Sequence, residues 1–314
     1  MPLTRPLSDS VVVVTGASSG IGAGVALMLA RRGTRVVLAA RGEPALSELA
    51  ERCQRWGTAA LVVPTDVSDS VAVQRLADTA RDRFGRIDAW INNAAVGVYG
   101  RLLDLPMQDL RRVVDVNLMG YLHGARAAVP ALRAAGGGVL VMVASLLGEV
   151  SVPYMGAYTI AKHGVLGLCN TLRQELRGEG TTEVSVCAVL PASIDTPFFS
   201  HAANHTGRAI RPVPPVNPPW RIAGRIIRLL ESPRRQAYAG LGGTALGLTW
   251  RFAPGITERL LAAYAKRVTF ISDRAAPVTL GTLYEPPSQP LEVEGGWRRH
   301  DLTGLAEVPS VVGR

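Results

Sequence analysis

The sequence predicts an α/β fold in which helices flank a doubly wound, parallel β-sheet. Two observations support this prediction. Short apolar runs rich in β-branched residues, which are typical of strands buried on both faces, alternate along the chain with longer helical patterns. The first of these runs, residues 11–14, passes through a glycine-rich turn directly into a helical pattern, as strands do in open sheets of this kind.

Length and composition indicate one large domain, or one domain with an appendage. The chain has 314 residues, of which 47% are hydrophobic and 19% charged, so it can bury a large core. Its three cysteines, Cys53, Cys169 and Cys187, are too scattered for a disulfide framework or a metal cluster and suggest a reducing compartment. The uncharged runs at 134–148 and 236–250 fall short of the roughly 20 residues that a membrane span needs. We therefore expect a soluble, cytoplasmic protein.

The net charge of +9 is concentrated in one region. Residues 208–267 contain 11 Lys and Arg against 2 Asp and Glu, whereas residues 1–200 contain 19 against 17. The basic region has no recognisable nucleic-acid reader, so no nucleic-acid partner is expected. A helix expected at 220–230 carries arginines along one face. That face is either solvated, with the helix docked on the core, or a contact for an anionic membrane or acyl carrier.

The remaining elements follow in order. Further strands are expected at residues 35–40, 59–64, 87–91 and 139–144, where short apolar runs recur, and helices at residues 44–56, 71–84 and 107–132. Asn117 lies in the middle of the last of these helices, and Asn is a mediocre helix former because its side chain competes for backbone groups. It therefore marks either a local bend or a buried polar role.

The turn after the first strand, residues 15–22, reads TGASSGIG. Its glycines let the backbone approach a pyrophosphate and let the helix pack close to the strand, while the helix N-terminus supplies donors and a positive dipole end. A bare glycine-rich loop is sometimes only a structural turn. The position of this one, between a strand and a helix near the N-terminus, predicts a phosphate-binding loop.

Two charged residues follow the next strands. Arg41 ends the strand at 35–40, where an acidic residue would bind the 2′-hydroxyl of NAD and an Arg accommodates the 2′-phosphate of NADP. Its presence beside neutral Ala40 favours NADP, although Arg41 could also be merely solvated. Asp66, just past the strand at 59–64, either accepts from the adenine amino group or caps a helix.

A serine, a tyrosine and a lysine form the candidate chemical centre. Ser145 follows the strand at 139–144, at the sheet edge where ligands bind. If residues 158–162 are helical, Tyr158 and Lys162 stack on one face, one turn apart. A buried cation beside a phenol lowers the pKa of the phenol from about 10 towards neutrality, which makes Tyr158 a candidate general acid/base. Taken alone, such a pair is common.

These motifs together resemble the short-chain dehydrogenase/reductase (SDR) family over about residues 8–243. TGASSGIG, Asp66-Val67, the NNAA sequence at 92–95, Asn117, Ser145 and the YxxxK at 158–162 occur in the order and spacing of that family. The resemblance implies a Rossmann-type sheet of about seven strands, closed by a strand at 236–241. It also implies an NAD(P)-dependent oxidoreductase that acts on a small-molecule carbonyl or alcohol.

The resemblance assigns roles to particular residues. Tyr158 would give or accept the proton, and Lys162 would lower its pKa and hold the nicotinamide ribose. Ser145 would hydrogen-bond the substrate oxygen, and Asn117 would support a water-linked proton relay to Lys162. The positions expected to contact the cofactor are Gly16, Ser18, Ser19, Gly20, Ile21, Gly22, Arg41, Asp66, Val67, Asn93, Ala94, Ala95, Tyr158, Lys162, Pro191, Ile194 and Thr196.

The chain departs from the family pattern at two positions. Ala95 and Ala192, the residue after Pro191, stand where the family usually has glycine. Each adds one methyl group near the expected path of the nicotinamide. Neither change removes a catalytic group.

Residues 1–243 would form the catalytic domain, within which residues 193–219, with Phe198 and Phe199, are the expected substrate lid. His201 and His205 lie four residues apart within the lid without an evident third ligand, so no metal is expected. Residues 244–314 would form a C-terminal extension of about 70 residues, first helical and then a weakly ordered tail from about residue 286. The extension would cap the substrate pocket, lie on a membrane surface, or cover a face that family members use for oligomer contacts. A homodimer or homotetramer stays open for this protein.

The leading function is hydride transfer between NADP(H), with NAD(H) less favoured, and a ketone or secondary alcohol. The two Phe residues of the lid and apolar neighbours such as Leu146 suggest a lipophilic substrate. Two alternatives stay open. One is a membrane-surface reductase of lipid-like ketones, supported by the basic region 208–267, and the other is a non-catalytic dinucleotide-binding regulatory protein.

Overall fold

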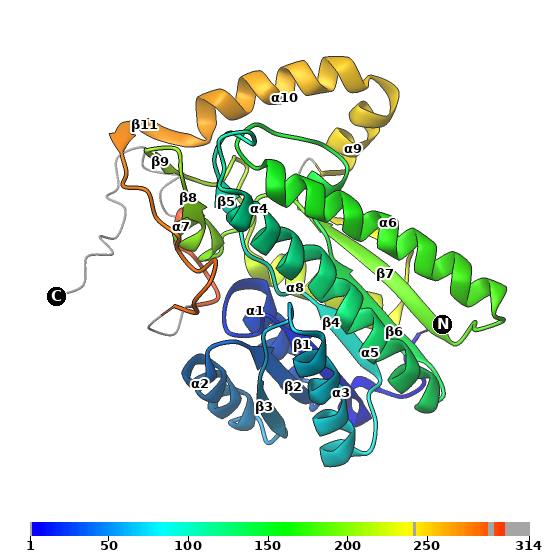
Figure 1. The fold of residues 1–314 in the computed structure, drawn as a ribbon. Helices are drawn as coiled ribbons and strands as arrows, with labels where there is room; N and C mark the ends of the chain where they lie inside the picture. The colour runs from blue at the N-terminus through cyan, green and yellow to red at the C-terminus, as the bar shows by residue number, and fades with distance from the viewer. Residues whose placement is uncertain (1, 241–242, 288–291, 299–314) are drawn as a thin grey trace.

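A seven-stranded parallel sheet forms the centre of the protein (Figure 1). The structure, a computed structural model, describes residues 2–240, 243–287 and 292–298. The sheet has the strand order β10-β7-β6-β4-β1-β2-β3. Its strands are β1 (Val11–Thr15), β2 (Arg35–Ala40), β3 (Ala60–Pro64), β4 (Ala89–Asn92), β6 (Gly138–Val143), β7 (Val184–Pro191) and β10 (Gln236–Ala239). The predicted α/β fold with a doubly wound parallel sheet is confirmed.

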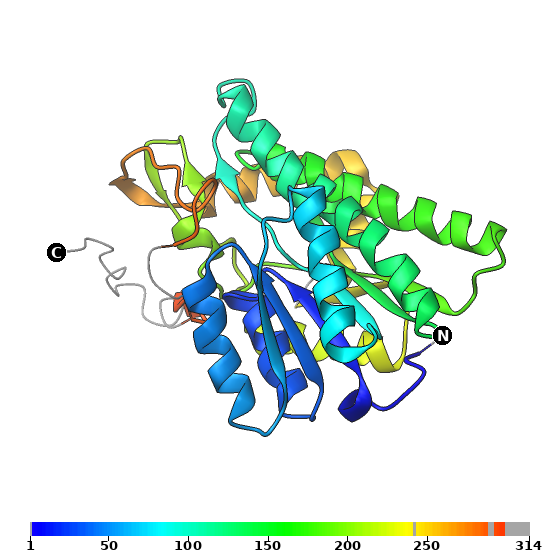
Figure 2. The same ribbon diagram turned by 60° about the horizontal axis from the view of Figure 1, so that its bottom comes forward.

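Helices cover both faces of this sheet (Figures 1 and 2). One face packs against α1 (Gly20–Ala30), α2 (Glu43–Gln54) and α8 (Pro219–Glu231), and the other against α3 (Ser70–Phe84), α4 (Met107–Val114), α5 (Gly120–Ala134) and α6 (Gly156–Gly178). Successive residues of β1 supply the two cores in turn, because side chains of a strand alternate between its faces: Val11 and Val13 join one, Val12 and Val14 the other. The strand order reverses between β1 and β4, so a crevice opens at the carboxyl ends of these strands.

The helix expected at 107–132 is interrupted by a π-helical turn. α4 passes into this turn at Asp115–Met119, and α5 continues from Gly120. The side chain of Asn117, inside the turn, accepts from the backbone N–H of Val96 and donates to its carbonyl, each at 2.8 Å. A π-turn adds one residue to a helical turn and re-aims a side chain. The mid-helix Asn therefore marks both a local irregularity and a buried polar role.

Shorter elements lie beyond the carboxyl end of the sheet. They are β5 (Val98–Tyr99), the 3-10 helix Leu146–Gly148, α7 (Phe198–His201), β8 (Ala203–Asn204), β9 (Arg208–Ile210), α9 (Gly243–Phe252), α10 (Pro254–Val268) and β11 (Phe270–Ala275). β8 pairs with β5, and β11 pairs antiparallel with β9, so the extension is joined to the lid segment. Figure 1 shows α10 lying across this end of the molecule. No helix among the described residues combines the length and apolarity needed to cross a membrane.

Part of the tail is packed against the domain, although its composition predicted weak order from residue 286. Val293 is buried in the core that contains α1 and α8. The backbone N–H groups of Gly295 and Trp297 bond the carboxylate of Asp195 at 3.1 and 2.8 Å. Residues 288–291 and 299–314, to which the same prediction applied, lie outside the described residues.

Gly124→Ala tests how closely α5 approaches the sheet. A Cβ atom at Gly124 would lie 2.1 Å from Oδ1 of Asn92, which is buried and already accepts from Trp90 Nε1. We expect the substitution to lower the free energy of unfolding by about 1–3 kcal/mol, measured by urea denaturation. Gly167→Ala is the matched control, because its Cβ would meet nothing within 4 Å, and it should stabilise α6 by up to about 1 kcal/mol. Equal losses in the two variants would contradict the close approach.

Candidate active site

One cavity of about 480 Å³ occupies the crevice at the carboxyl ends of the strands. It brings together most of the residues that the sequence singled out, from loops far apart in the chain. Its lining includes Gly16, Ser18, Ser19, Gly20, Ile21, Arg41, Asp66, Val67, Asn93, Ala94, Ala95, Ser145, Tyr158, Lys162, Pro191, Ile194 and Thr196. Gly22 and Asn117 do not line it. They lie behind it, Gly22 under the glycine loop and Asn117 against Val96.

The glycine loop is tightly packed between β1 and the loop after β4. Gly16 has a φ of +65°, and a Cβ atom there would lie 2.6 Å from Cα of Ala94. A Cβ at Gly22 would lie 2.2 Å from the carbonyl oxygen of Gly16. Only glycine fits these two positions without a shift of backbone. The result is a cradle of backbone at the N-terminus of α1, which suits a dinucleotide pyrophosphate.

Thr15 and Asn93 hold this cradle in place. The hydroxyl of Thr15 accepts from the backbone N–H groups of Asn93 and Ala94 at 3.0 and 3.2 Å. The side-chain amide of Asn93 donates to the carbonyls of Thr15 and Gly16 at 3.0 and 3.1 Å. Thr15 had no predicted role of its own. Its position at the carboxyl end of β1, directly before the first glycine, is the signal that marks it.

Ser145, Tyr158 and Lys162 meet at the end of β6. Ser145 follows that strand and Tyr158 and Lys162 lie on α6, one turn apart, as expected. The Lys162 ammonium is almost fully buried and donates to the Val143 carbonyl at 2.8 Å and to the Tyr121 hydroxyl at 3.0 Å. It lies 5.5 Å from the centroid of the Tyr158 ring. Tyr121, on α5, was missed because only the tertiary fold brings it to Lys162.

Burial governs the titration of both groups. Burial raises the pKa of Tyr158 to about 12, and a hydrogen bond with Ser145 opposes this rise only in part. Burial lowers the pKa of Lys162 from 10.5 to about 7. From the sequence we expect Lys162 to lower the pKa of Tyr158. The structure differs because desolvation disfavours both charged forms and because the ammonium is directed at Tyr121 and Val143.

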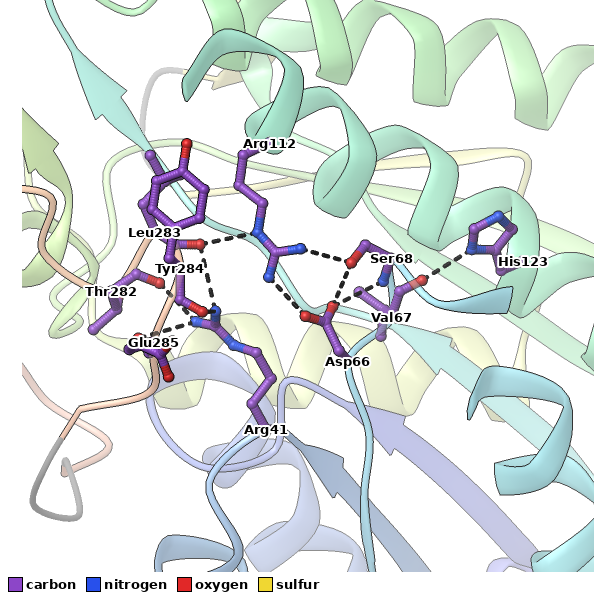
Figure 3. Close-up of polar contacts among 10 residues, drawn as sticks. All are labelled: Arg41, Asp66, Val67, Ser68, Arg112, His123, Thr282, Leu283, Tyr284 and Glu285. Carbon is purple, nitrogen blue, oxygen red and sulfur yellow. Dashed lines mark hydrogen bonds and ion pairs between the residues drawn. The ribbon is translucent and has the colours of Figure 1, made fainter. Parts of the chain in front are cut away.

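Asp66 lies in a network of polar contacts at the other end of the cavity (Figure 3). Its carboxylate accepts from Arg112 at 2.7 Å and from the hydroxyl and backbone N–H of Ser68 at 2.7 and 2.9 Å. Burial works against ionisation, but these hydrogen bonds outweigh it and hold the pKa of Asp66 below its usual value. The N-cap of α3 is Asp69, which accepts from the backbone N–H groups of Val71 and Ala72. Asp66 is therefore not the cap of that helix.

Arg41 also lies in this network, but its guanidinium contacts the C-terminal extension. Its two Nη atoms donate to the backbone carbonyls of Tyr284 at 2.5 Å and Thr282 at 2.6 Å (Figure 3). Arg41 still lines the cavity beside Asp66. The sequence could not reveal these partners, which lie more than 240 residues further along the chain.

The other half of the cavity has mainly apolar walls. The lid segment contributes Phe198, Phe199 and Val213, and the extension contributes Leu246, Leu261 and Tyr264. The ring of Phe198 meets that of Tyr158 edge-on at a centroid distance of 5.6 Å. Ala95 and Ala192, which replace the expected glycines, also line the cavity. His205 contacts the carboxylate of Asp109 at 2.8 Å.

The sheet topology, the backbone cradle and the polar cluster at the end of β6 define a Rossmann-type dinucleotide-binding protein. Comparison with known proteins agrees: the family model for short chain dehydrogenase matches residues 10–206. The chain belongs to the short-chain dehydrogenase family, and it is therefore an oxidoreductase of a family that uses a nicotinamide dinucleotide.

Several relatives are similar over most of their length. The chain is 35% identical over 305 residues to the uncharacterized oxidoreductase YxnA of Bacillus subtilis (strain 168), covering 95% of this chain and 81% of YxnA. It is 31% identical to dehydrogenase/reductase SDR family member 7B of Xenopus tropicalis, covering 85% and 89%. Its structure resembles an alcohol dehydrogenase from the archaeon Thermococcus sibiricus complexed with 5-hydroxy-NADP, with a TM-score of 0.64 and 28% identity over 73% of this chain and 94% of that chain.

Lys162→Met tests the lowered pKa of the buried amine. The unfolded chain keeps the Lys162 proton up to about pH 10.5, whereas the folded protein releases it near pH 7. The unfolded state binds more protons in that interval, so this group makes the free energy of unfolding rise with pH. The stability of the wild type relative to the variant should therefore grow by up to about 1.4 kcal/mol per pH unit.

The measurement is urea denaturation at several pH values across that interval. Lys266→Met is the matched control, because Lys266 is the second of the two lysines and is exposed. Its stability relative to the wild type should not change with pH. A pH-independent difference for Lys162→Met as well would show that Lys162 keeps its proton in the folded protein.

Proposed function

We propose that this protein transfers a hydride between NADP(H) and a ketone or secondary alcohol, with Tyr158 as the general acid/base. The observation that carries the proposal is the convergence of Ser145, Tyr158 and Lys162 on the cavity that also contains the glycine cradle. When bound, the nicotinamide supplies or accepts the hydride. The residues that would hold the dinucleotide are the backbone of the glycine loop, Asn93 to Ala95, and Pro191 to Thr196.

The side chains then have complementary parts. In reduction, Ser145 and Tyr158 donate hydrogen bonds to the ketone oxygen, so negative charge is stabilised as it develops there, and Tyr158 delivers the proton. In oxidation, Tyr158 takes the proton of the alcohol. The raised pKa of Tyr158 keeps the phenol protonated at neutral pH, which suits reduction. Because both polar side-chain atoms of Asn117 are paired with Val96, its part in a proton relay would fall to its backbone.

Charge at the end of β2 supports NADP(H) over NAD(H). Ala40, Arg41 and Gly42 line the cavity there, and none of them offers the carboxylate that would accept from a 2′-hydroxyl. Arg41 and nearby Arg112 instead place two guanidinium groups at this end. The similar alcohol dehydrogenase was solved with 5-hydroxy-NADP, which agrees with the same choice.

The apolar walls formed by the lid and the extension support a lipophilic substrate. The three buried cysteines are free thiols, in line with a reducing compartment such as the cytoplasm. The alternative of a non-catalytic binding protein is less well supported, because it leaves the buried Lys162 amine and the Ser145 hydrogen bond to Tyr158 without a use.

Tyr158→Phe tests the reaction. With a panel of ketones and alcohols and both dinucleotides, followed by nicotinamide absorbance, we expect kcat to fall by about 10²–10⁴-fold while the dinucleotide still binds. Tyr154→Phe is the control, since Tyr154 does not line the cavity, and it should keep wild-type turnover. Full activity in Tyr158→Phe would exclude its role as acid/base, and faster turnover with NAD(H) would overturn the cofactor choice.

A specific surface favours a second candidate, in which the enzyme takes its substrate at an anionic membrane. Exposed apolar side chains recur every four residues along α9 and α10, at Leu248, Phe252, Ile256, Leu260 and Tyr264. The same two helices carry four Arg or Lys residues and one Glu, a charge that complements anionic lipid. Because α10 also lines the cavity, a lipid surface would lie next to the substrate site.

Co-sedimentation with vesicles containing anionic phospholipid tests this candidate. We expect the wild type to bind at physiological salt and the double variant Phe252→Asp, Ile256→Asp to stay in solution, because it replaces apolar contact with charge repulsion. Val71→Asp, at an exposed apolar position on α3, should bind like the wild type. Wild-type protein that remains in the supernatant at physiological salt would remove the membrane candidate.

A further inference from the structure

Two stretches of the extension follow the rim of the cofactor half of the cavity. Residues 279–287 and 292–298 are together called the belt. The first stretch starts at the lid: Thr279 and Asn204 exchange backbone hydrogen bonds of 2.8 and 3.1 Å, and the backbone N–H of Thr282 donates to the carbonyl of His201 at 2.8 Å. Figure 1 shows this segment returning from β11 towards the sheet.

The first stretch is then anchored at the adenosine end of the cavity. Besides the two close contacts of Arg41, the Nε of Arg112 donates to the carbonyl of Leu283 at 3.1 Å (Figure 3). The hydroxyl of Tyr284 donates to Oδ1 of Asp109 at 2.6 Å. Asp109 is fully buried. Its carboxylate is a fixed acceptor, and hydrogen bonds to charged acceptors are stronger than neutral ones.

The second stretch is anchored on the opposite side of the glycine loop. The backbone N–H of Gly20 donates to the carbonyl of Glu292 at 3.2 Å. The buried carboxylate of Asp195 accepts from the backbone N–H groups of Gly295, Trp297 and Arg298 at 3.1, 2.8 and 3.3 Å. Val293 fills a place in the core beside Gly24. Each of the two stretches of the belt is therefore bound by a buried carboxylate of the catalytic domain, Asp109 for the first and Asp195 for the second.

The belt borders the cavity and does not fill it. Thr282, Pro286 and Pro287 line the same cavity as Gly20, Arg41 and Asp66. Arg41 lies between the cavity and the belt, because it lines the cavity while its Nη atoms donate to backbone carbonyls of the belt. A dinucleotide seated on the glycine cradle would thus have the sheet on one side and the belt on the other.

We propose that the belt is a wall of the dinucleotide site that closes over the bound cofactor and slows its release. The proposal rests on the cofactor site of the proposed function. For the dinucleotide to leave past the adenosine rim, the contacts of Tyr284 with Asp109, or of Asp195 with residues 295–298, must open. Because the belt also bonds His201 and Asn204 of the lid, opening at the cofactor end is mechanically linked to the substrate end. Tyr284 and Asp195 are thus positioning residues for the cofactor.

Tyr284→Phe tests the proposal, because it removes only the hydroxyl that bonds Asp109. NADPH, or NADH if it binds more tightly, is loaded on the full-length protein, and its dissociation is followed by stopped-flow fluorescence. We expect release to be faster by about tenfold, the effect of losing one hydrogen bond to a charged group. The rate of hydride transfer in a single turnover should not change, because the hydrogen bonds and ring contacts of Ser145, Tyr158 and Lys162 involve no described residue of the belt.

Two further variants make the result specific. Gly281 has a φ of +48°, and a Cβ atom there would lie 2.1 Å from the carbonyl oxygen of His201, so Gly281→Ala shifts the belt without removing a polar side chain. It should also speed release. Tyr238→Phe is the matched control, because Tyr238 bonds the carboxylate of Glu149 at 3.0 Å, away from the belt. It should release the dinucleotide at the wild-type rate.

The outcomes separate the belt from the reaction. If the dinucleotide leaves both Tyr284→Phe and Gly281→Ala at the wild-type rate or more slowly, the proposal that the belt slows release is wrong. It is also wrong if Tyr238→Phe releases the dinucleotide as fast as these two variants. Slower hydrogen exchange of residues 292–298 when the dinucleotide is bound would support it. If the wild type binds the dinucleotide but transfers hydride to no ketone or alcohol, the proposed reaction fails while the comparison of release rates still decides on the belt.

Discussion

The buried amine of Lys162 is the interaction on which the rest of the site depends. Its contacts with the Val143 carbonyl and the Tyr121 hydroxyl tie α6 to the end of β6 and to α5. A buried amine without hydrogen-bond partners would lower the stability of the fold, because burying an unpaired polar group costs free energy. The two hydrogen bonds of Lys162 reduce this cost. Meeting both partners fixes the rotation of α6, and this rotation places Tyr158 beside Ser145 in the lining of the cavity.

The sequence predicted the sheet and the location of the site because both depend on local patterns. Apolar runs, a glycine turn and polar residues at the carboxyl ends of strands can each be recognised within a short stretch of sequence. The hydrogen-bonding partners of the site residues could not be predicted in the same way. Tyr121 beside Lys162, Thr15 beneath the cradle and the carbonyls around Arg41 are joined to their partners only by the tertiary fold. The predicted direction of the Tyr158 pKa shift was wrong for a related reason: the shift depends on how deeply the fold buries the phenol as well as on the nearest charge.

The extension shows how composition alone can mislead. A polar stretch rich in Pro and Gly has little apolar surface to offset the entropy of ordering, which favours weak order. Here a few long-range contacts outweigh that tendency: one apolar side chain, Val293, enters the core, and a buried carboxylate, Asp195, gathers three backbone N–H groups. Asp195 itself shows no distinguishing pattern in the sequence, since the backbone N–H groups that donate to its carboxylate follow it by about a hundred residues.

The position of the belt after the last strand of the central sheet has a consequence for biosynthesis. Every strand of the central sheet has been synthesised once residue 239 has been added, but the partners of Arg41 lie 241 residues and more after it. At about 5–20 residues per second, residues 279–298 leave the ribosome several seconds after β10. During that interval the nascent domain has all the strands of its sheet and its glycine cradle, and the rim stays open until residues 279–298 have emerged.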